Sequence, residues 1–116
     1  MTTPVTRFQH QGRTHTHTWT GITEGDPTGE AAVLPGAADR SVHVFGTFGG
    51  GTITMQGSNQ KVPTDWQTLH DSGGDPLTFT TAGILAVDEN VLHYRPLLSG
   101  GSGSSVNVII ASRSTQ

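Results

Sequence analysis

The chain has 116 residues, of which 32% are hydrophobic and 13% are charged, and Gly, Ser and Thr fill much of the remainder. An average domain carries about 25% charged residues, so this composition indicates one β-rich domain with many turns. The net charge of −3 argues against a nucleic-acid-binding protein, which usually has a basic stripe, and the lack of cysteine excludes a disulfide framework and thiolate chemistry. The sequence has no membrane-length apolar run and no signal-peptide segment, so we expect a protein made and folded in a cytosol.

The first twenty residues are polar, and residues 14–20 alternate between the two faces of an extended chain. One face would carry His15, His17 and Trp19, and threonines would occupy the other. That face has too little apolar content to offset the entropy of ordering by itself. We therefore expect residues 1–18 to be an extended arm that orders on a neighbouring subunit, with Trp19 as the anchor of an added strand.

The glycines at 49–51 raise the question of a phosphate-binding loop. Such a loop needs a Lys followed by Ser or Thr, and then a helix whose N-terminus faces the phosphate. Here the next segment, 52–56, alternates as a strand does and no Lys follows the glycines. We expect residues 49–51 to be the turn of a hairpin that needs positive φ.

From residue 41 onward, hydrophobic residues recur at every second position. This period predicts strands over 41–48, 52–56, 77–81, 91–98 and 105–112, and no segment has helical spacing. We expect an all-β fold over residues 19–116, a single-domain antiparallel β-sandwich or jelly-roll-like barrel of about seven or eight strands. The residues expected in its core are Val44, Phe48, Ile53, Trp66, Leu77, Phe79, Tyr94, Val106 and Val108.

The histidines do not form a convincing catalytic or metal-binding pattern. His15 and His17 would present two imidazoles, which His10 or His43 could supplement, but no Asp or Glu lies nearby in sequence as a further ligand. His70 precedes an aspartate, yet the G-x-S-x-G motif of a nucleophile elbow is missing. We expect no catalytic, metal or cofactor site, and a protein that is not an enzyme.

The aromatic residues admit two interpretations. Trp19, Trp66 and Tyr94 would be a sugar-stacking platform if they shared a surface, but core and anchor roles are favoured. Arg95 follows Tyr94 at a strand end, where we expect it to pair with an acidic group or a neighbouring chain. The candidate contact residues for a capsid or a second subunit are therefore His15, His17, Trp19 and Arg95.

The segments ADRSVHVFGTFGGGTITMQGSN, DWQTLHDSGGDPLTFT and YRPLLSGGSGSSVNVIIASR occur in an order that resembles small structural proteins from the head-gene clusters of tailed bacteriophages. In that family a V-x-V-x-G-T-F-G strand precedes a Q/E-G-S-N turn, a W-x-x-L segment, a YxRP strand and a Gly-rich loop. The upstream THTWTGITEGD is similar to the W-x-G-L-x-x-G-D entry of the same proteins. The resemblance spans about residues 19 to 113, and its motifs are features of the backbone and core.

This resemblance implies a capsid decoration, or cement, protein that binds the major capsid protein on the outer surface of the virion head after synthesis in the cytoplasm of the bacterial host. By the same analogy we expect a homo-oligomer, with a trimer favoured and a dimer as the alternative. From the composition we expect no binding to nucleic acid or membrane, and we expect no cofactor. Two alternatives stay open: a carbohydrate-binding or adhesin module displayed on the virion, and a tail or neck component with the same fold.

Overall fold

The computed structural model describes residues 2–10, 13–34 and 39–113. These residues form twelve strands and no helix. In chain order the strands are β1 (Thr2–Thr3), β2 (Val5–Gln9), β3 (Thr14–Ile22), β4 (Thr28–Gly29), β5 (Ala32–Val33), β6 (Asp39–Thr47), β7 (Thr52–Ser58), β8 (Gln67–Thr68), β9 (Thr78–Phe79), β10 (Gly83–Ala86), β11 (His93–Ser99) and β12 (Ser105–Arg113).

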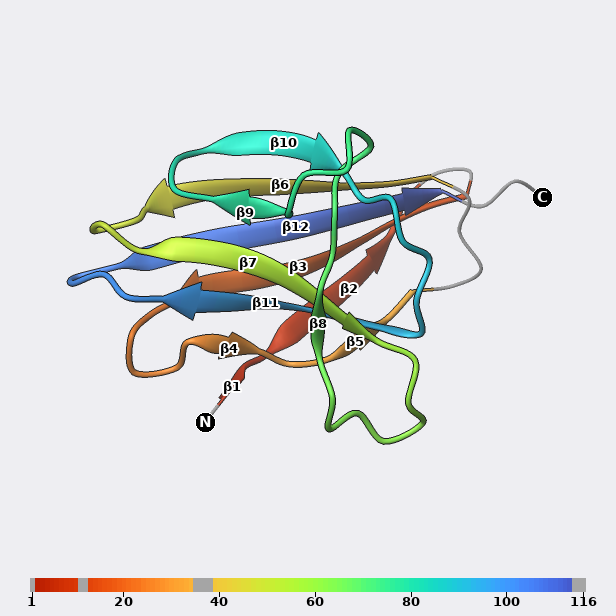
Figure 1. Cartoon of the computed structure of the whole chain (residues 1–116), viewed down its shortest axis with the longest axis horizontal. Coiled ribbons are helices and arrows are strands. Elements are labelled where there is room, and N and C mark those ends of the chain that lie inside the picture. The colour runs from red at the N-terminus through yellow and green to blue at the C-terminus, as the bar shows by residue number, and fades with distance from the viewer. Residues whose placement is uncertain (1, 11–12, 35–38, 114–116) are drawn as a thin grey trace.

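The strands form two sheets that pack face to face as a β-sandwich, which confirms the expected fold class (Figure 1). Sheet B has the order β10-β6-β12-β3-β2 and is antiparallel throughout. Sheet A has the order β1-β4-β11-β7-β8, with β5 also paired to β11 and β9 to β7. Among the described residues, β1 and β4 form the one parallel pair.

The chain passes repeatedly from one sheet to the other, so that several strands that are consecutive in sequence lie in opposite sheets. β3, β6 and β12 lie in sheet B, and the strands joined to them, β4, β7 and β11, lie in sheet A. The order β3-β12-β6-β10 in sheet B therefore matches β4-β11-β7-β9 in sheet A. This paired winding is characteristic of jelly-roll-like sandwiches. The turns that join β3 to β4, β6 to β7 and β11 to β12 all lie at one end of the molecule, the left end in Figure 1.

Period-two alternation places one side of each long strand in the core. In sheet B, Trp19 and Val44 flank Val108 in one cross-strand row, and all three are fully buried. Seven of the nine residues expected in the core are buried, and Phe48 is partly buried against it. These seven are Val44, Ile53, Leu77, Phe79, Tyr94, Val106 and Val108.

Trp66 was the wrong prediction in that set. It precedes the two-residue edge strand β8, is only partly buried, and lies beneath the guanidinium of Arg95 with 4.1 Å between Cζ and the ring centroid. A strand of two residues is too short for alternation to define which face is inner. Trp66 therefore stands beside the sandwich rather than inside it.

The prediction for residues 49–51 was right about the turn and wrong about the strands that it joins. The amide of Gly51 donates to the carbonyl of Phe48 at 2.8 Å, and Gly49 and Gly50 have φ of 58° and 83°, as a tight turn with positive φ requires. However, the hairpin prediction was wrong, because β6 and β7 belong to opposite sheets. Each long strand has a different partner, β12 for β6 and β11 for β7. Glycines between two alternating strands do not distinguish a hairpin from a crossover between sheets.

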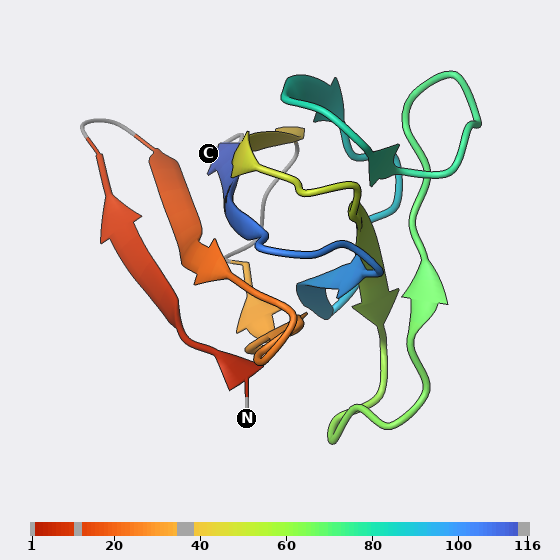
Figure 2. The same cartoon turned by 90° about the vertical axis from the view of Figure 1, so that its left-hand side faces the viewer.

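The expectation of an extended arm over residues 1–18 needs correction. Its described residues pair within the same chain: β2 lies at the edge of sheet B and β3 lies between β2 and β12 (Figure 2). β3 gains backbone hydrogen bonds on both sides, and the buried Trp19 donates from Nε1 to the carbonyl of Glu30 at 2.8 Å. These contacts offset the ordering entropy that low apolar content alone leaves uncompensated. The arm hypothesis did not consider that β12, far away in the same chain, supplies the partner strand for β3.

Candidate interaction surface

Three of the four expected contact residues lie inside the sandwich. His15, His17 and Trp19 alternate along the inner side of β3 and are 9%, 3% and 0% exposed. In this conformation they contact their own chain, so they cannot form an exposed capsid or subunit surface. The alternation was read correctly, but it marks the core side of a strand instead of a docking face.

His15 and His17 belong to a polar section of the inner face of sheet B. Ser112 lies opposite His15 on one side and Arg40 on the other, and Arg40 donates from Nη2 to the carbonyl of Asp88 at 3.4 Å. Burial lowers the pKa of His17, and the positive charge of Arg7 and the neighbouring His15 lower it further. This section favours a neutral imidazole at His17, at the end of the core.

The four histidines considered as metal ligands are not brought together. His15 and His17 face the core, whereas His43 stacks with Phe45 on the outer face of the sheet, with 4.9 Å between ring centroids. His10 bonds to the hydroxyl of Thr16 at 3.0 Å. Within the described ranges, no group of three or more His, Cys, Asp or Glu side chains could hold a metal ion.

His70 is paired with Glu89 rather than with the adjacent aspartate. One carboxylate oxygen of Glu89 lies 2.6 Å from His70 Nδ1, and the other accepts from the His70 amide at 2.7 Å. Burial raises the pKa of Glu89, but the hydrogen bonds from His70 outweigh that effect and leave the pKa below its ordinary value. Asp71 instead accepts from the amides of Gly73 and Asp75 and closes an Asx turn. His70 and Glu89 thus clasp two loops together.

Within the described chain Arg95 has neutral partners rather than the acidic group that was one of the two expectations; contact with a neighbouring chain stays a prediction. Its Nε donates to Oε1 of Gln56 at 2.9 Å, and its guanidinium covers Trp66. Desolvation lowers the pKa of Arg95. Because Trp19 and Tyr94 are buried, the three aromatic residues share no surface and form no sugar-stacking platform.

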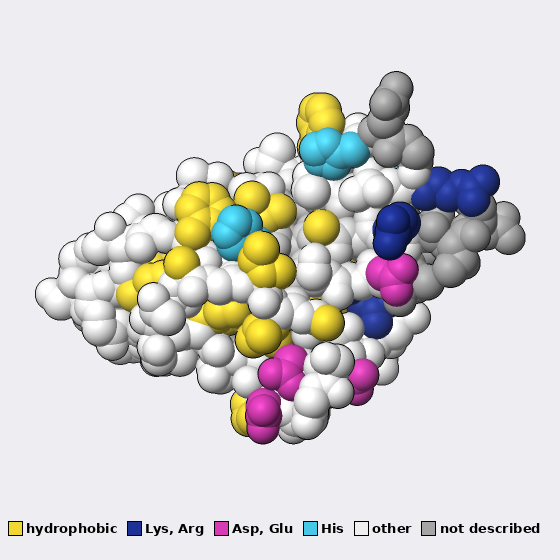
Figure 3. Space-filling view, turned by 90° about the horizontal axis from the view of Figure 1, so that it is seen from above, with side chains coloured by type: hydrophobic (Ala, Val, Ile, Leu, Met, Phe, Trp, Pro, Cys, Tyr) yellow, Lys and Arg dark blue, Asp and Glu magenta, His cyan; other side chains and the backbone are white. Residues whose placement is uncertain are grey.

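The outer side of sheet B carries mostly uncharged side chains, and we call it the open face. It is formed by the outward residues of β3, β6, β10 and β12, whose neighbours in sequence point into the core. Hydrophobic side chains gather in its middle around a histidine, and charged side chains lie toward one end and the rim (Figure 3). The open face comprises Thr14, Thr16, Thr18, Ser41, His43, Phe45, Ile84, Ala86, Asn107, Ile109 and Ala111.

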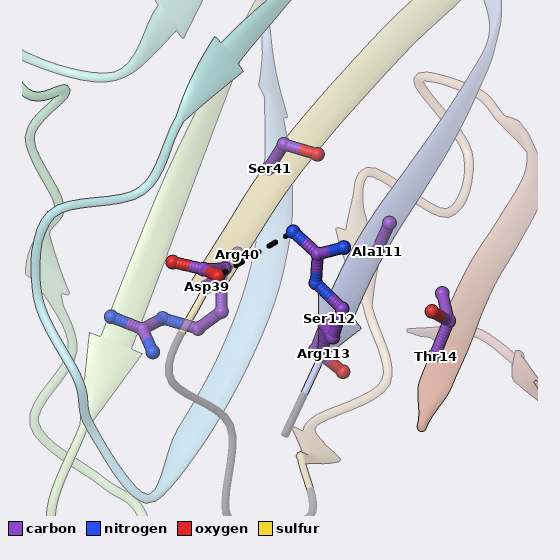
Figure 4. A pocket seen from close by; sticks show the side chains of 7 residues that line it. All are labelled: Thr14, Asp39, Arg40, Ser41, Ala111, Ser112 and Arg113. Carbon is purple, nitrogen blue, oxygen red and sulfur yellow. Dashed lines mark ion pairs between the residues drawn. The ribbon is translucent and has the colours of Figure 1, made fainter. Parts of the chain in front are cut away.

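A shallow depression of about 250 Å³ lies where the open face ends, above Ala111 (Figure 4). At its rim the guanidinium of Arg113 is directed toward Asp39, with 3.7 Å between Nη2 and Oδ2. Both side chains are largely exposed, so the pair contributes little to stability, but each charge offsets the other. The open face is therefore neutral even at this end.

A second depression of about 430 Å³ lies between β8 and residues 89–91 and is rich in amides and carboxylates. Most of these groups already bond within the chain. The Oε1 of Gln60 accepts from the amides of Thr64 and Asp65, and the Oδ1 of Asn59 accepts from the amide of Leu92. The groups brace the 59–66 loop instead of pointing toward a ligand.

Comparison with known proteins finds no matching family model, no similar curated protein and no similar solved structure. The described residues include no helix with the length and apolarity of a membrane span.

The alternation over residues 41–48 predicts that one side of this strand is buried, but it does not predict the open face as a surface. β10 was not predicted either, because its four residues GILA are too few to show a period. The high content of Ser and Thr was the feature of the sequence that pointed to an uncharged, hydroxyl-rich surface.

Proposed function

We propose that this protein is a structural component of a tailed-bacteriophage virion, a decoration protein that binds the outside of the assembled head. The observation that carries the proposal is the open face, a broad sheet surface of hydroxyl and apolar side chains without net charge. A rigid sheet of this kind supplies many individually weak contacts, and repetition over a capsid lattice multiplies them into stable attachment. The sequence resemblance to phage head proteins supports the same role.

The neutrality of the open face gives the proposal a distinctive signature. The chain has a net charge of −3, but the charged side chains on the outward side of β6 and β12 are Asp39 and Arg113, which lie together next to the eleven side chains and offset each other's charge. Attachment through charged patches weakens as salt screens them, whereas attachment through hydroxyl and apolar contacts does not. Capsid binding by this protein is therefore expected to persist as ionic strength rises.

The test uses capsids that lack the protein, mixed with the full chain and sedimented to count bound copies. Ile109→Lys places a charge in the middle of the open face, and Thr54→Lys places the same charge at a partly buried position on the outer side of sheet A. We expect Ile109→Lys to lower occupancy and Thr54→Lys to bind as the unmodified chain does. Failure of the unmodified chain to bind capsids would overturn the proposed function.

Two measurements separate this function from the alternatives. A decoration protein occupies purified particles in proportion to the capsomers, whereas a neck or tail component occurs in far fewer copies. A carbohydrate-binding module gives reproducible signals on a glycan array. Because the aromatic residues share no surface and the polar depression is internally bonded, we expect no glycan signal.

A further inference from the structure

The exposed strand edges of the sandwich are protected unequally. Natural sheets blunt their edges with very short strands, charged side chains, prolines or bulges, because an open edge accepts another strand. In sheet A, the peripheral strands β1, β5, β8 and β9 have only two residues each. In sheet B, the edge strand β2 carries Arg7 at its centre.

β10 is longer than these two-residue strands and has no charged residue, proline or bulge. Its sequence is Gly-Ile-Leu-Ala, and among the described strands it pairs only with β6. Ile84 is 62% exposed on the open-face side, and Leu85 is 36% exposed on the opposite side. Ile84 also lies opposite His43, whose ring contacts Phe45, so an apolar strip runs from the open face to this edge.

The edge is suited to a second copy of itself. A two-fold axis perpendicular to a sheet pairs identical edge strands in antiparallel orientation. In registers centred on Ile84 or on Leu85, that residue meets its own copy and no charged side chain of β10 enters the pair. The same operation on β2, centred on its middle residue, would place Arg7 opposite another Arg7, which is unfavourable.

We propose that β10 pairs with β10 of a second copy, which joins two five-stranded sheets into one ten-stranded sheet and makes the two open faces continuous. Four paired residues extend only about 13 Å, and the contact is well below the ~800 Å² per partner of a standard stable interface. Self-association is therefore weak in solution. It strengthens where copies are held side by side on a surface.

Engineered cysteines test the contact directly, because the chain has none of its own. We expect Ile84→Cys or Leu85→Cys to give a disulfide-linked dimer on mild oxidation, because the Cβ atoms of directly opposite residues lie about 4.5–5.5 Å apart and a small shift brings them within the roughly 3.5–4.5 Å of a disulfide. Phe8→Cys is the matched control, because Phe8 is 61% exposed on the opposite edge strand of the same sheet. Equal dimer yields from all three variants would overturn the proposal.

Sedimentation equilibrium over a wide concentration range gives the second readout. The unmodified chain and Phe8→Lys should self-associate alike, whereas Ile84→Lys should weaken association by roughly tenfold or more, because it adds charge and removes an apolar contact. Both positions are exposed, so we expect each variant to fold, and its melting temperature checks this. An unmodified chain that stays monomeric at every concentration would overturn the proposal.

The two proposals fail separately. Self-association is measured on the isolated chain, so it is independent of whether capsids are bound. Leu85→Lys tests the edge without changing the open face, because Leu85 lies on the opposite side of β10. If the isolated chain is monomeric and Leu85→Lys abolishes capsid binding while Thr54→Lys does not, the edge receives a strand from the capsid, and the second-copy proposal is overturned.

Discussion

The carbonyl oxygen of Gly49 accepts a hydrogen bond from the amide of Ser102 at 2.9 Å, and this bond joins the two glycine-rich turns that cross between the sheets. The hydroxyl of Ser104 adds a bond of 2.7 Å to the carbonyl of Phe48, and the Ser104 amide donates to Glu24 at 2.9 Å. Three separate crossings are thereby held together at one end of the sandwich.

Replacement of Gly49 is expected to cost more stability than replacement of Gly50. Both have positive φ, so alanine at either position is strained by about 1 kcal/mol. A Cβ at Gly49 would in addition lie 2.2 Å from the carbonyl oxygen of Ser102, whereas a Cβ at Gly50 meets nothing within 4 Å. Urea denaturation of Gly49→Ala and Gly50→Ala measures the difference, and equal losses would contradict it.

The two tryptophans should differ sharply in their contribution to stability. Trp19→Phe removes the hydrogen bond from a fully buried indole to the carbonyl of Glu30 and leaves a smaller ring in the core, which should cost about 1–3 kcal/mol. Trp66→Phe keeps a ring beneath Arg95 on the outer side of sheet A, and should change stability by less than about 1 kcal/mol. Chemical denaturation followed by circular dichroism, rather than by tryptophan fluorescence, provides the comparison.

Acid should destabilise the fold through His17. Its pKa is below the ordinary 6.5, so the native state binds fewer protons than the unfolded chain in this range. The stability it contributes is full above about 6.5 and is lost as pH falls from there through the lowered pKa. The groups around the His17 imidazole are Arg7, which lies opposite it on β2, and His15 on the same strand. Arg40 and Ser112 lie nearby on β6 and β12 of sheet B.

His17→Gln, which cannot be protonated, should flatten this dependence. The free energy of unfolding is measured at pH 7 and pH 5 for both proteins. His43→Gln is the control, because His43 is exposed on the open face. A loss of stability between the two pH values that is the same with and without His17 would contradict the assignment.

A second, more acidic step should come from Glu89. Its pKa is lowered from 4.5, so its contribution is present above that value and is lost as pH falls through the lowered pKa. Glu89→Gln weakens the clasp on His70 at neutral pH and should remove this step. Thermal melts between pH 6 and pH 3 provide the measurement, and an unchanged profile in the variant would count against the clasp.

Truncation should reveal where the first strands belong. Removal of residues 1–9 takes away β1 and the edge strand β2, and the remaining chain should fold with reduced stability. Removal of residues 1–18 also cuts β3 and strips β12 of most of its partner, and this chain should not fold. Far-ultraviolet circular dichroism distinguishes the outcomes. A cooperative melt of the chain that lacks residues 1–18 would restore the arm hypothesis.

Sequence patterns predicted the fold class and the long strands because alternation over seven to nine residues specifies which side is buried. They did not predict which strands pair. β3 and β12, for example, are neighbours in sheet B but are separated by most of the chain in sequence. The same limit hid the pairing of His70 with Glu89, nineteen residues apart. The positions of His15 and His17 were misassigned because polar residues on an inner face do not mark it as a core face.

The position of β12 has a consequence for biosynthesis. β12 lies between β3 and β6 and hydrogen-bonds to both, so the centre of sheet B is missing until residues 105–113 have been made. A nascent chain emerging from the ribosome therefore has one unpaired edge on β3 and one on β6 until residues 105–113 emerge. Such edges invite aggregation, and distant pairing slows folding. A stop codon a few residues before Ser105 would therefore yield an insoluble product rather than a smaller domain.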